Sequence, residues 1–417
     1  MPEALFMSDQ KDLRPPTQVL TRGFDPSLSV GSARPAVFRS STYVFPSPEA
    51  AERAFDLVAG RAQPAVGEQP DLIYSRFNHP NAEILESRVV PLETGANAAL
   101  AFNSGMAAIV TALFAFVRPG QNIIYTVPIY GGTQHLIEDF LSTLNIGGVP
   151  VQAGHTGEMD EAIRSTKNLA VVLIETPANP TIVMTDIRHA TDRVAHLHPK
   201  PLVMVDNTLM GPTFQHPLML GADLSIYSAT KYLSGLSDLI AGIAIARDPN
   251  LIRQMRSKRN LFGNILQPDE CWMLEGRLPT VTLRMNRSSK NAERIAIRLA
   301  KHPKVDRVLY PTLFTDPEQV EIARHQCDFP GGMLSIDLRG GKKAAFEFLR
   351  NLRIARNAVS LGGVETLVCH PKTTTHSGFT EEEFAAAGVT DGLVRISIGI
   401  EDWRDLMTDF EQALDLV

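Results

Sequence analysis

From about Asn81 onward, short apolar runs alternate with stretches in which apolar residues recur at helical spacing. Short apolar runs between polar segments are typical of strands that are covered on both faces. We expect such strands at Ala98–Phe102, Asn122–Thr126, Ala170–Glu175, Leu202–Asp206 and Ile240–Ala246. Helical segments separate most of them, and this order predicts a mostly parallel sheet with helices on both sides, an α/β fold.

The helices expected around this sheet have recognisable ends. Ala82–Leu92 has the spacing of an amphipathic helix, and Ser104 begins a second helix that ends near Val117. A long helical stretch over about Asp269–Lys301 follows the sheet, and Pro279 within it predicts a kink.

A smaller α+β region is expected beyond this stretch. Gly332–Leu338 and Leu393–Ile398 have the pattern of strands, and Lys342–Leu352 and Trp403–Leu416 that of helices. We therefore predict a large domain and a smaller C-terminal α+β domain, preceded by an N-terminal arm. The expected parts are the arm at 1–75, the large domain at 76–270 and the small domain at 271–417.

The N-terminal arm lacks apolar periodicity over most of its length and is rich in Pro, Ser and Arg. One helix is expected near Pro48–Ala59. A segment of this length without a core of its own is expected to wrap another surface, either on its own domain or on a partner subunit.

Composition and charge narrow the function classes. The chain has 417 residues, of which 44% are hydrophobic and 21% charged, as in an ordinary globular protein. Its 40 basic and 46 acidic residues give a net charge of −6, so we expect no nucleic-acid binding. The longest apolar stretch, around Ile109–Val117, is too short to span a membrane. Three cysteines far apart, without a CxxC pair, indicate neither a zinc site nor a disulfide framework, and we expect no metal and a cytoplasmic location.

Lys231 is the first candidate for chemistry. A buried strand runs into two hydroxyl residues, Ser228 and Thr230, directly beside this lysine. Such hydroxyls suit a phosphate, and the amine suits condensation with the aldehyde of a phosphorylated cofactor. A surface lysine after a strand is the alternative, and it is the more common case when the motif is considered alone.

Other motifs favour the cofactor interpretation. The turn Asn103–Ala107, which contains Gly105 and Met106, places backbone N–H groups at a helix N-terminus, where anions bind. Asp206 ends an apolar strand, where a carboxylate can hold a pyridinium nitrogen protonated, although it could equally cap a helix.

Two further residues complete the candidate site. Tyr130 precedes two glycines, Gly131 and Gly132, which would let its ring stack on a flat cofactor or merely form a turn. Arg395 lies inside an otherwise apolar strand and needs an anion there, either a substrate carboxylate or an internal acid. Taken together, these residues describe pyridoxal 5′-phosphate acting on an amino acid.

The chain also resembles a known family through motifs spread from about Thr42 to its end. The motifs are YSRFNHPN (74–81), NSGMAA (103–108), PIYGGT (128–133), ETPANP (175–180), VDNT (205–208), SATKY (228–232), SLGGVETL (360–367) and RISIGIED (395–402). In this combination they resemble the Cys/Met-metabolism group of pyridoxal-phosphate enzymes. The group includes cystathionine γ-synthase, cystathionine γ-lyase, methionine γ-lyase and O-acetylhomoserine sulfhydrylase.

The resemblance implies a type I aminotransferase-like fold and a role for each matching residue. Lys231 would bind the cofactor covalently, Asp206 its ring nitrogen and Tyr130 its ring face. Its phosphate would be held by a set from this chain (Gly105, Met106, Ser228, Thr230) and by Tyr74 and Arg76 of a neighbouring subunit. Ser360 and Arg395 would hold the substrate carboxylate. The family assembly is usually a tetramer, a pair of dimers with shared active sites.

Departures from the family pattern bear on the reaction. Methionine γ-lyases usually carry a cysteine at the position of Gly132, and Leu236 replaces a common histidine. Val359 stands where members that handle cystathionine often carry glutamate, which favours methionine-like or O-acylhomoserine substrates. We expect γ-elimination by a carbon–sulfur lyase. The alternatives are a γ-replacement transferase and, from another class, a non-catalytic protein that keeps the cofactor fold for regulation; the presence of both Lys231 and Asp206 speaks against the latter.

Overall fold

The computed structural model describes residues 13–417 except 64, 66–67 and 69–70. Its larger sheet has seven strands, in the order β1-β7-β6-β5-β4-β2-β3. Their bounds are β1 Ala98–Phe102, β2 Asn122–Val127, β3 Gly147–Gln152, β4 Leu169–Glu175, β5 Leu202–Asp206, β6 Leu224–Ser228 and β7 Gly242–Ala246. β7 is antiparallel to both of its neighbours, and every other pair is parallel. The predicted mostly parallel sheet is confirmed.

Two strands differ from the pattern-based expectation. β3 was not expected, because its sequence GGVPVQ contains two glycines and a proline; it pairs only with β2, and Pro is tolerated in such an edge strand. β7 begins at Gly242 rather than at Ile240, whose side chain is exposed in the preceding loop.

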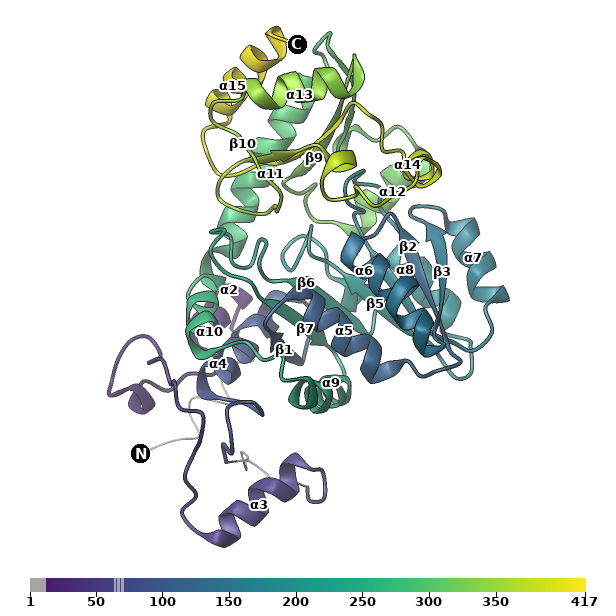
Figure 1. The fold of residues 1–417 in the computed structure, drawn as a ribbon. Helices are drawn as coiled ribbons and strands as arrows, with labels where there is room; N and C mark the ends of the chain where they lie inside the picture. The colour runs from purple at the N-terminus through teal and green to yellow at the C-terminus, as the bar shows by residue number, and fades with distance from the viewer. Residues whose placement is uncertain (1–12, 64, 66–67, 69–70) are drawn as a thin grey trace.

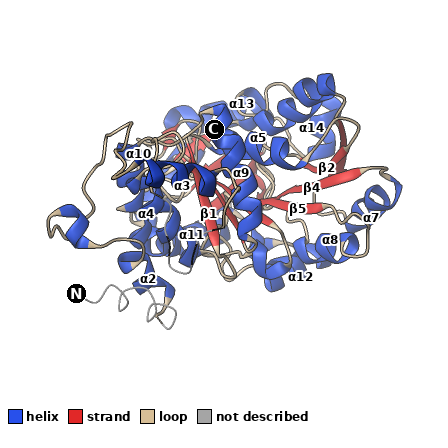
Figure 2. Cartoon of the chain, turned by 90° about the horizontal axis from the view of Figure 1, so that it is seen from below, coloured by secondary structure: helices blue, strands red, loops and turns tan. Residues whose placement is uncertain are grey.

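Helices cover both faces of this sheet because its apolar side chains alternate in direction (Figure 2). The helices packed on the sheet are α4 Pro80–Val89, α5 Gly105–Phe116, α7 Thr156–Ser165, α8 Ile187–Val194, α9 Pro249–Phe262 and α10 Pro268–Glu275. Leu100 and Phe102 pack with α5 and α9 on one face, whereas Ala99 and Ala101 pack with α4 and α10 on the other.

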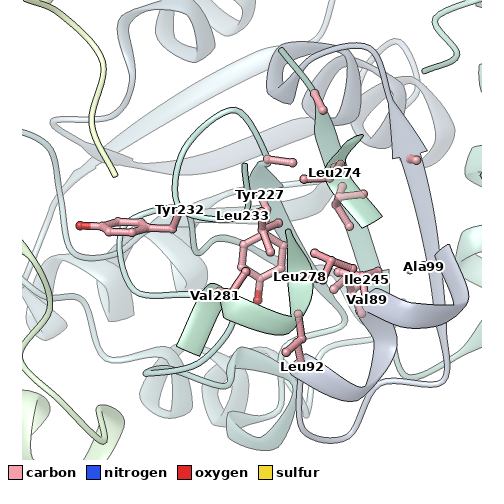
Figure 3. Packing of buried hydrophobic residues seen from close by; sticks show 14 of the residues in the cluster. Val89, Leu92, Ala99, Tyr227, Tyr232, Leu233, Ile245, Leu274, Leu278 and Val281 are labelled. Carbon is pink, nitrogen blue, oxygen red and sulfur yellow. The ribbon is translucent and has the colours of Figure 1, made fainter. Parts of the chain in front are cut away.

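Figure 3 shows the hydrophobic cluster between the strands β1, β6 and β7 and the helices α4 and α10. Ala99, Tyr227 and Ile245 of the strands lie in one cluster with Leu274 and Val89 of the helices. All five side chains are buried, so truncating the larger ones to alanine costs about 2–5 kcal/mol each. This packing fixes the strand end from which the Lys231 loop emerges.

A second, smaller sheet follows in the C-terminal part, drawn above the first in Figure 1. Its order is β10-β11-β12-β9-β8. The strands are β8 Val305–Leu309, β9 Met333–Leu338, β10 Arg356–Asn357, β11 Leu367–Cys369 and β12 Leu393–Ser397. Val394 and Ile396 pack toward α11 Val281–Leu299, α13 Gly341–Asn351 and α15 Trp403–Asp415, so the intervening Arg395 projects from the opposite face.

The expected helix over 269–301 is interrupted at Pro279. α10 ends at Glu275, a 3₁₀ turn covers Leu278–Thr280, and α11 begins at Val281. The remaining helices are α2 Pro15–Thr21, α3 Pro48–Val58, α6 Gly131–His135, α12 Pro317–Gln326 and α14 Glu381–Ala387. Among the described helices, none is long and apolar enough to cross a membrane.

The N-terminal arm contains the expected helix, α3, and also α2, which was not expected. α3 extends away from the rest of the chain in Figure 1. Within the expected arm, residues 1–12, 64, 66–67 and 69–70 lie outside the described residues. The domain boundaries at 75 and 270 stay a prediction.

Candidate active site

The expected site residues converge on one edge of the seven-stranded sheet. β7 is antiparallel to both β1 and β6, and the strands β2, β4, β5 and β6 are parallel. The carboxyl ends of β1, β2, β4, β5 and β6 therefore meet at one edge, where open α/β sheets bind ligands. Gly105 and Met106 follow β1, Tyr130 follows β2, Asp206 ends β5, Ser228 ends β6, and Thr230 and Lys231 follow it.

Lys231 lies in the loop between β6 and β7, and its Nζ donates a hydrogen bond to Ser360 Oγ at 3.0 Å. Burial and the positive charge of Arg395 lower the pKa of Lys231 to about 8, while Asp206 opposes the shift. About a tenth of this amine is therefore unprotonated at pH 7, and about half of it at pH 8. An unprotonated amine is the form that attacks an aldehyde.

Asp206 is held through one of its two carboxylate oxygens. Thr208 donates to Oδ1 from its backbone N–H at 3.1 Å and from its hydroxyl at 2.6 Å, and Thr208 Oγ1 accepts from Ser228 N–H at 2.8 Å. Burial raises the pKa of Asp206 against these hydrogen bonds and the charge of Lys231. The described hydrogen bonds leave Oδ2 available to a ring nitrogen.

Gly105 lies where α5 approaches the end of β6. A Cβ at this position would be 2.9 Å from Ser228 Cβ and 3.0 Å from its Cα, so only glycine fits without a shift of the helix start. Ser104 caps α5 by accepting from Ala107 N–H, while the first N–H groups of a helix have no partner within it. With the hydroxyls of Ser228 and Thr230 nearby, these N–H groups form a cup suited to a phosphate.

Tyr130 precedes α6, and its side chain is 47% exposed. Gly132 lies directly beside the ring, since a Cβ there would be 2.7 Å from Tyr130 Cε1 and 3.2 Å from Met106 Sδ. The glycine thus allows the ring its present position next to the phosphate cup.

Arg395 is buried and bonded to two neutral acceptors. Its Nη1 donates to Asn179 Oδ1 at 3.1 Å, and its Nη2 donates to the Ser360 carbonyl at 2.8 Å. Ser360 has a left-handed backbone (φ 85°), so one residue accepts from Lys231 through its hydroxyl and from Arg395 through its carbonyl. The other guanidinium N–H groups can pair with a carboxylate.

Sequence reasoning missed two residues of this site, Glu175 and Asn179. Glu175 Oε2 accepts from Tyr130 N–H at 2.8 Å, and its Oε1 accepts from Asn179 N–H at 3.1 Å. Burial, followed by the adjacent carboxylate of Asp206, raises the pKa of Glu175 to about 8. Both residues lie in the ETPANP motif, which was the available signal.

His376 was also missed. Its Nε2 lies 3.1 Å from the Asn179 carbonyl, and its Nδ1 lies 2.8 Å from Thr375 Oγ1. Burial and the charge of Arg395 lower the pKa of His376 to about 4, so the ring is neutral near pH 7 and donates from Nε2. This hydrogen bond from His376 holds the main chain of Asn179, whose side chain accepts from Arg395.

Tyr74 and Arg76 are the two predicted site residues that the structure leaves apart from the others. Tyr74 forms a β-bridge with Thr42, and Arg76 donates to the Asn260 carbonyl and lies over the Phe77 ring. None of these described contacts reaches the Lys231 loop. Their role at a neighbouring subunit's phosphate stays a prediction.

The residues present fit pyridoxal phosphate. The close approach of Gly105 to Ser228 forms a cradle that a Cβ would fill, Asp206 keeps an oxygen for the ring nitrogen, and Lys231 supplies an amine of lowered pKa.

Comparisons with known proteins agree with this fit. A family model described as Cys/Met metabolism PLP-dependent enzyme matches residues 16–415. L-methionine gamma-lyase of Fusobacterium nucleatum subsp. nucleatum is 39% identical over 389 residues, which cover 93% of this chain and 94% of that protein. Cystathionine gamma-lyase of Bacillus subtilis is 38% identical over 353 residues, covering 85% and 91%. The structure of MetB from Corynebacterium glutamicum matches with a TM-score of 0.85 at 32% identity, covering 98% of this chain and 99% of that one.

Proposed function

Because the chain belongs to the Cys/Met metabolism PLP-dependent enzymes, we propose that it is a carbon–sulfur lyase acting at Cγ of a methionine-type amino acid. The products are 2-oxobutyrate, ammonia and a thiol. The expected α/β fold and the pyridoxal phosphate cofactor are confirmed by the family and by the MetB match. The choice of substrate and the reaction are the parts that we propose.

Each side chain of the site has a defined task in this reaction. Pyridoxal phosphate, when bound, supplies an aldehyde and a ring that withdraws electrons from Cα. Asp206 accepts a hydrogen bond from the protonated ring nitrogen, and Arg395 holds the substrate carboxylate. Lys231 would hold the cofactor through its amine, and the same amine, oriented by Ser360, would accept the Cα proton of the substrate. The Tyr130 hydroxyl donates a proton to the departing sulfur.

Val359 is the observation that carries the choice of substrate. It directly precedes Ser360, and 55% of its surface is exposed, so an apolar side chain borders the site. An apolar border disfavours a substrate with a second charged amino group at its far end and accepts a thioether. Relatives named L-methionine gamma-lyase, 36–39% identical to this chain, support the same choice.

γ-Replacement is the second candidate, and Gly132 favours it. A side chain at this position would meet the Tyr130 ring at 2.7 Å, so the cysteine usual in methionine γ-lyases would force the ring to another place. With glycine at position 132, the site differs from that of methionine γ-lyases directly beside Tyr130, the proposed proton donor. An O-acylhomoserine, whose ester leaves more readily, would then be the substrate, with a thiol or sulfide as acceptor.

One assay separates the two candidates. The purified enzyme is given L-methionine alone, and 2-oxobutyrate and methanethiol are measured. A second mixture contains O-acetyl- or O-succinyl-L-homoserine with sulfide or cysteine. Product in the mixture that contains only L-methionine supports the lyase. Product in the second mixture, with none in the first, shows a transferase.

We further propose that two chains share each active site in a homo-oligomer, a dimer or a pair of dimers. The arm exposes apolar side chains, among them Leu28, Val44 and Phe55, which suits a segment that packs on another subunit. Arg76 makes no ion pair within the described residues, while the cup at Gly105 offers a phosphate only neutral donors. The arginine of one chain would supply the missing charge to the cup of the other. The cytoplasmic location stays a prediction.

A further inference from the structure

Glu175 occupies a position between the two halves of the candidate site. It ends β4, is 3% exposed, and forms a register pair with Asp206 across the β4–β5 ladder. Its own N–H donates to Thr126 Oγ1 at 3.0 Å, which anchors it to β2. The main chain of Glu175 is therefore fixed by the sheet.

Each oxygen of this carboxylate holds the main chain of a different site residue. Oε2 accepts from Tyr130 N–H at 2.8 Å, and Oε1 accepts from Asn179 N–H at 3.1 Å. Tyr130 presents its ring on the cofactor side. On the substrate side, Asn179 Oδ1 accepts from Arg395 Nη1 at 3.1 Å. Glu175 is thus connected to Tyr130 by one hydrogen bond and, through Asn179, to the carboxylate-binding Arg395 by two.

The two main-chain N–H groups give a second reason for a group with two acceptor oxygens at this position. An apolar residue at position 175 would leave the N–H groups of Tyr130 and Asn179 without this acceptor.

We propose that Glu175 is a positioning residue that sets Tyr130 and Asn179 at a fixed separation, so that the cofactor ring and the substrate carboxylate are held in one arrangement. The claim about the substrate carboxylate rests on the proposed function. The claim about the cofactor ring requires only bound pyridoxal phosphate.

Glu175→Gln tests the proposal with almost no change of shape. A glutamine has one acceptor oxygen, and its NH₂ group would face the second N–H, so one of the two hydrogen bonds is lost. The visible circular dichroism per bound pyridoxal phosphate should fall, and KM for L-methionine or for O-acetyl-L-homoserine with sulfide should rise about tenfold. Glu175→Asp keeps both oxygens on a shorter side chain and should give a smaller change in both readouts.

Asp409→Asn is the matched control. Asp409, on α15, is also a buried carboxylate, and it accepts N–H groups from Arg353, Ile354 and Ala355 at 2.8–3.0 Å, none of them in the site. This variant should lower the thermal midpoint but leave the dichroism and KM as in the wild type.

Two outcomes overturn the proposal. One is wild-type dichroism and KM in both Glu175 variants, and the other is the same change of dichroism and KM in Asp409→Asn as in Glu175→Gln. Failure of the proposed lyase function looks different, because the wild-type enzyme would then give no product from L-methionine. The dichroism would still decide the role of Glu175, since it requires only bound cofactor.

Discussion

The amine of Lys231 is weakly basic because it is buried and shares its surroundings with Arg395, which lowers its pKa to about 8 from 10.5. A lowered pKa means that the reactive, neutral form predominates above pH 8 rather than above pH 10.5. We therefore expect the rate at which apoenzyme captures pyridoxal phosphate to rise with pH around a midpoint near 8. The rate can be followed by absorbance.

Arg395→Gln provides the control for this pH dependence. It removes one of the two causes of the shift, so the midpoint should move upward while burial keeps it below the ordinary value for lysine. A wild-type midpoint above pH 10 would show that the Lys231 amine is not held in this environment.

His376 has a pKa lowered to about 4 from 6.5, first by burial and then by the charge of Arg395. The unfolded chain binds this proton near pH 6.5 and the folded chain only near pH 4, so acid favours unfolding between these values. The expected loss is roughly 3 kcal/mol, complete by about pH 4. His376→Gln keeps a donor toward the Asn179 carbonyl without a titrating group.

The thermal midpoints of the two proteins at pH 7 and pH 4.5 measure this loss. The midpoint should fall less in His376→Gln than in the wild type. An equal fall in both proteins would assign the acid sensitivity to other groups.

At the scale of elements, the start of α5 depends on the absence of a side chain at Gly105. Gly105→Ala brings a Cβ within 3.0 Å of the Ser228 backbone, so the helix start must shift and its N–H groups lose their aim at a phosphate. We expect the dissociation constant of pyridoxal phosphate to rise at least about tenfold, the value of one lost charge-assisted hydrogen bond. Equilibrium dialysis of the apoenzyme measures it.

Gly157→Ala is the control for this substitution. Gly157 lies in α7, where an added Cβ meets no atom within 4 Å. It should leave cofactor affinity unchanged. Equal affinities in both variants would place the phosphate away from α5.

The elements that the sequence predicted well are those whose packing follows from local pattern. Strands such as Leu202–Asp206 are buried on both faces, and the chemistry at their ends, Asp206 included, could be predicted with them. β3, β8, β10 and β11 were missed, because edge strands (β3, β8 and β10) and very short strands (β10 and β11) leave little periodicity. The role of Glu175 could not be predicted from pattern, since it acts on the main chains of residues 45 and 4 positions away, and only the folded sheet brings the first of these near.

At the scale of the whole molecule, a shared site predicts that two inactive variants restore activity together. In a hybrid dimer of Lys231→Ala and Arg76→Ala chains, one site combines an intact lysine loop with an intact arginine from the other chain, and its twin carries both defects. Mixed and reassembled subunits should therefore recover about a quarter of wild-type activity, the share expected if half of the dimers are hybrids and each has one intact site. Activity is measured after mass spectrometry has verified the hybrids.

Two results test this prediction. Lys231→Ala and Arg76→Ala should each lose most of their activity when assayed alone. Verified hybrids as inactive as their parents would show that each chain builds its site alone.

The two ends of the proposed substrate contact different sheets. Lys231 follows β6 of the larger sheet, whereas Arg395 lies on β12 of the smaller one, and Ser360 links them through a hydroxyl and a carbonyl. An amino acid bound at its amine on one side and at its carboxylate on the other would connect the hydrophobic cores of the two sheets. Its binding would therefore stabilise the relative arrangement of the two sheets as well as prepare the reaction.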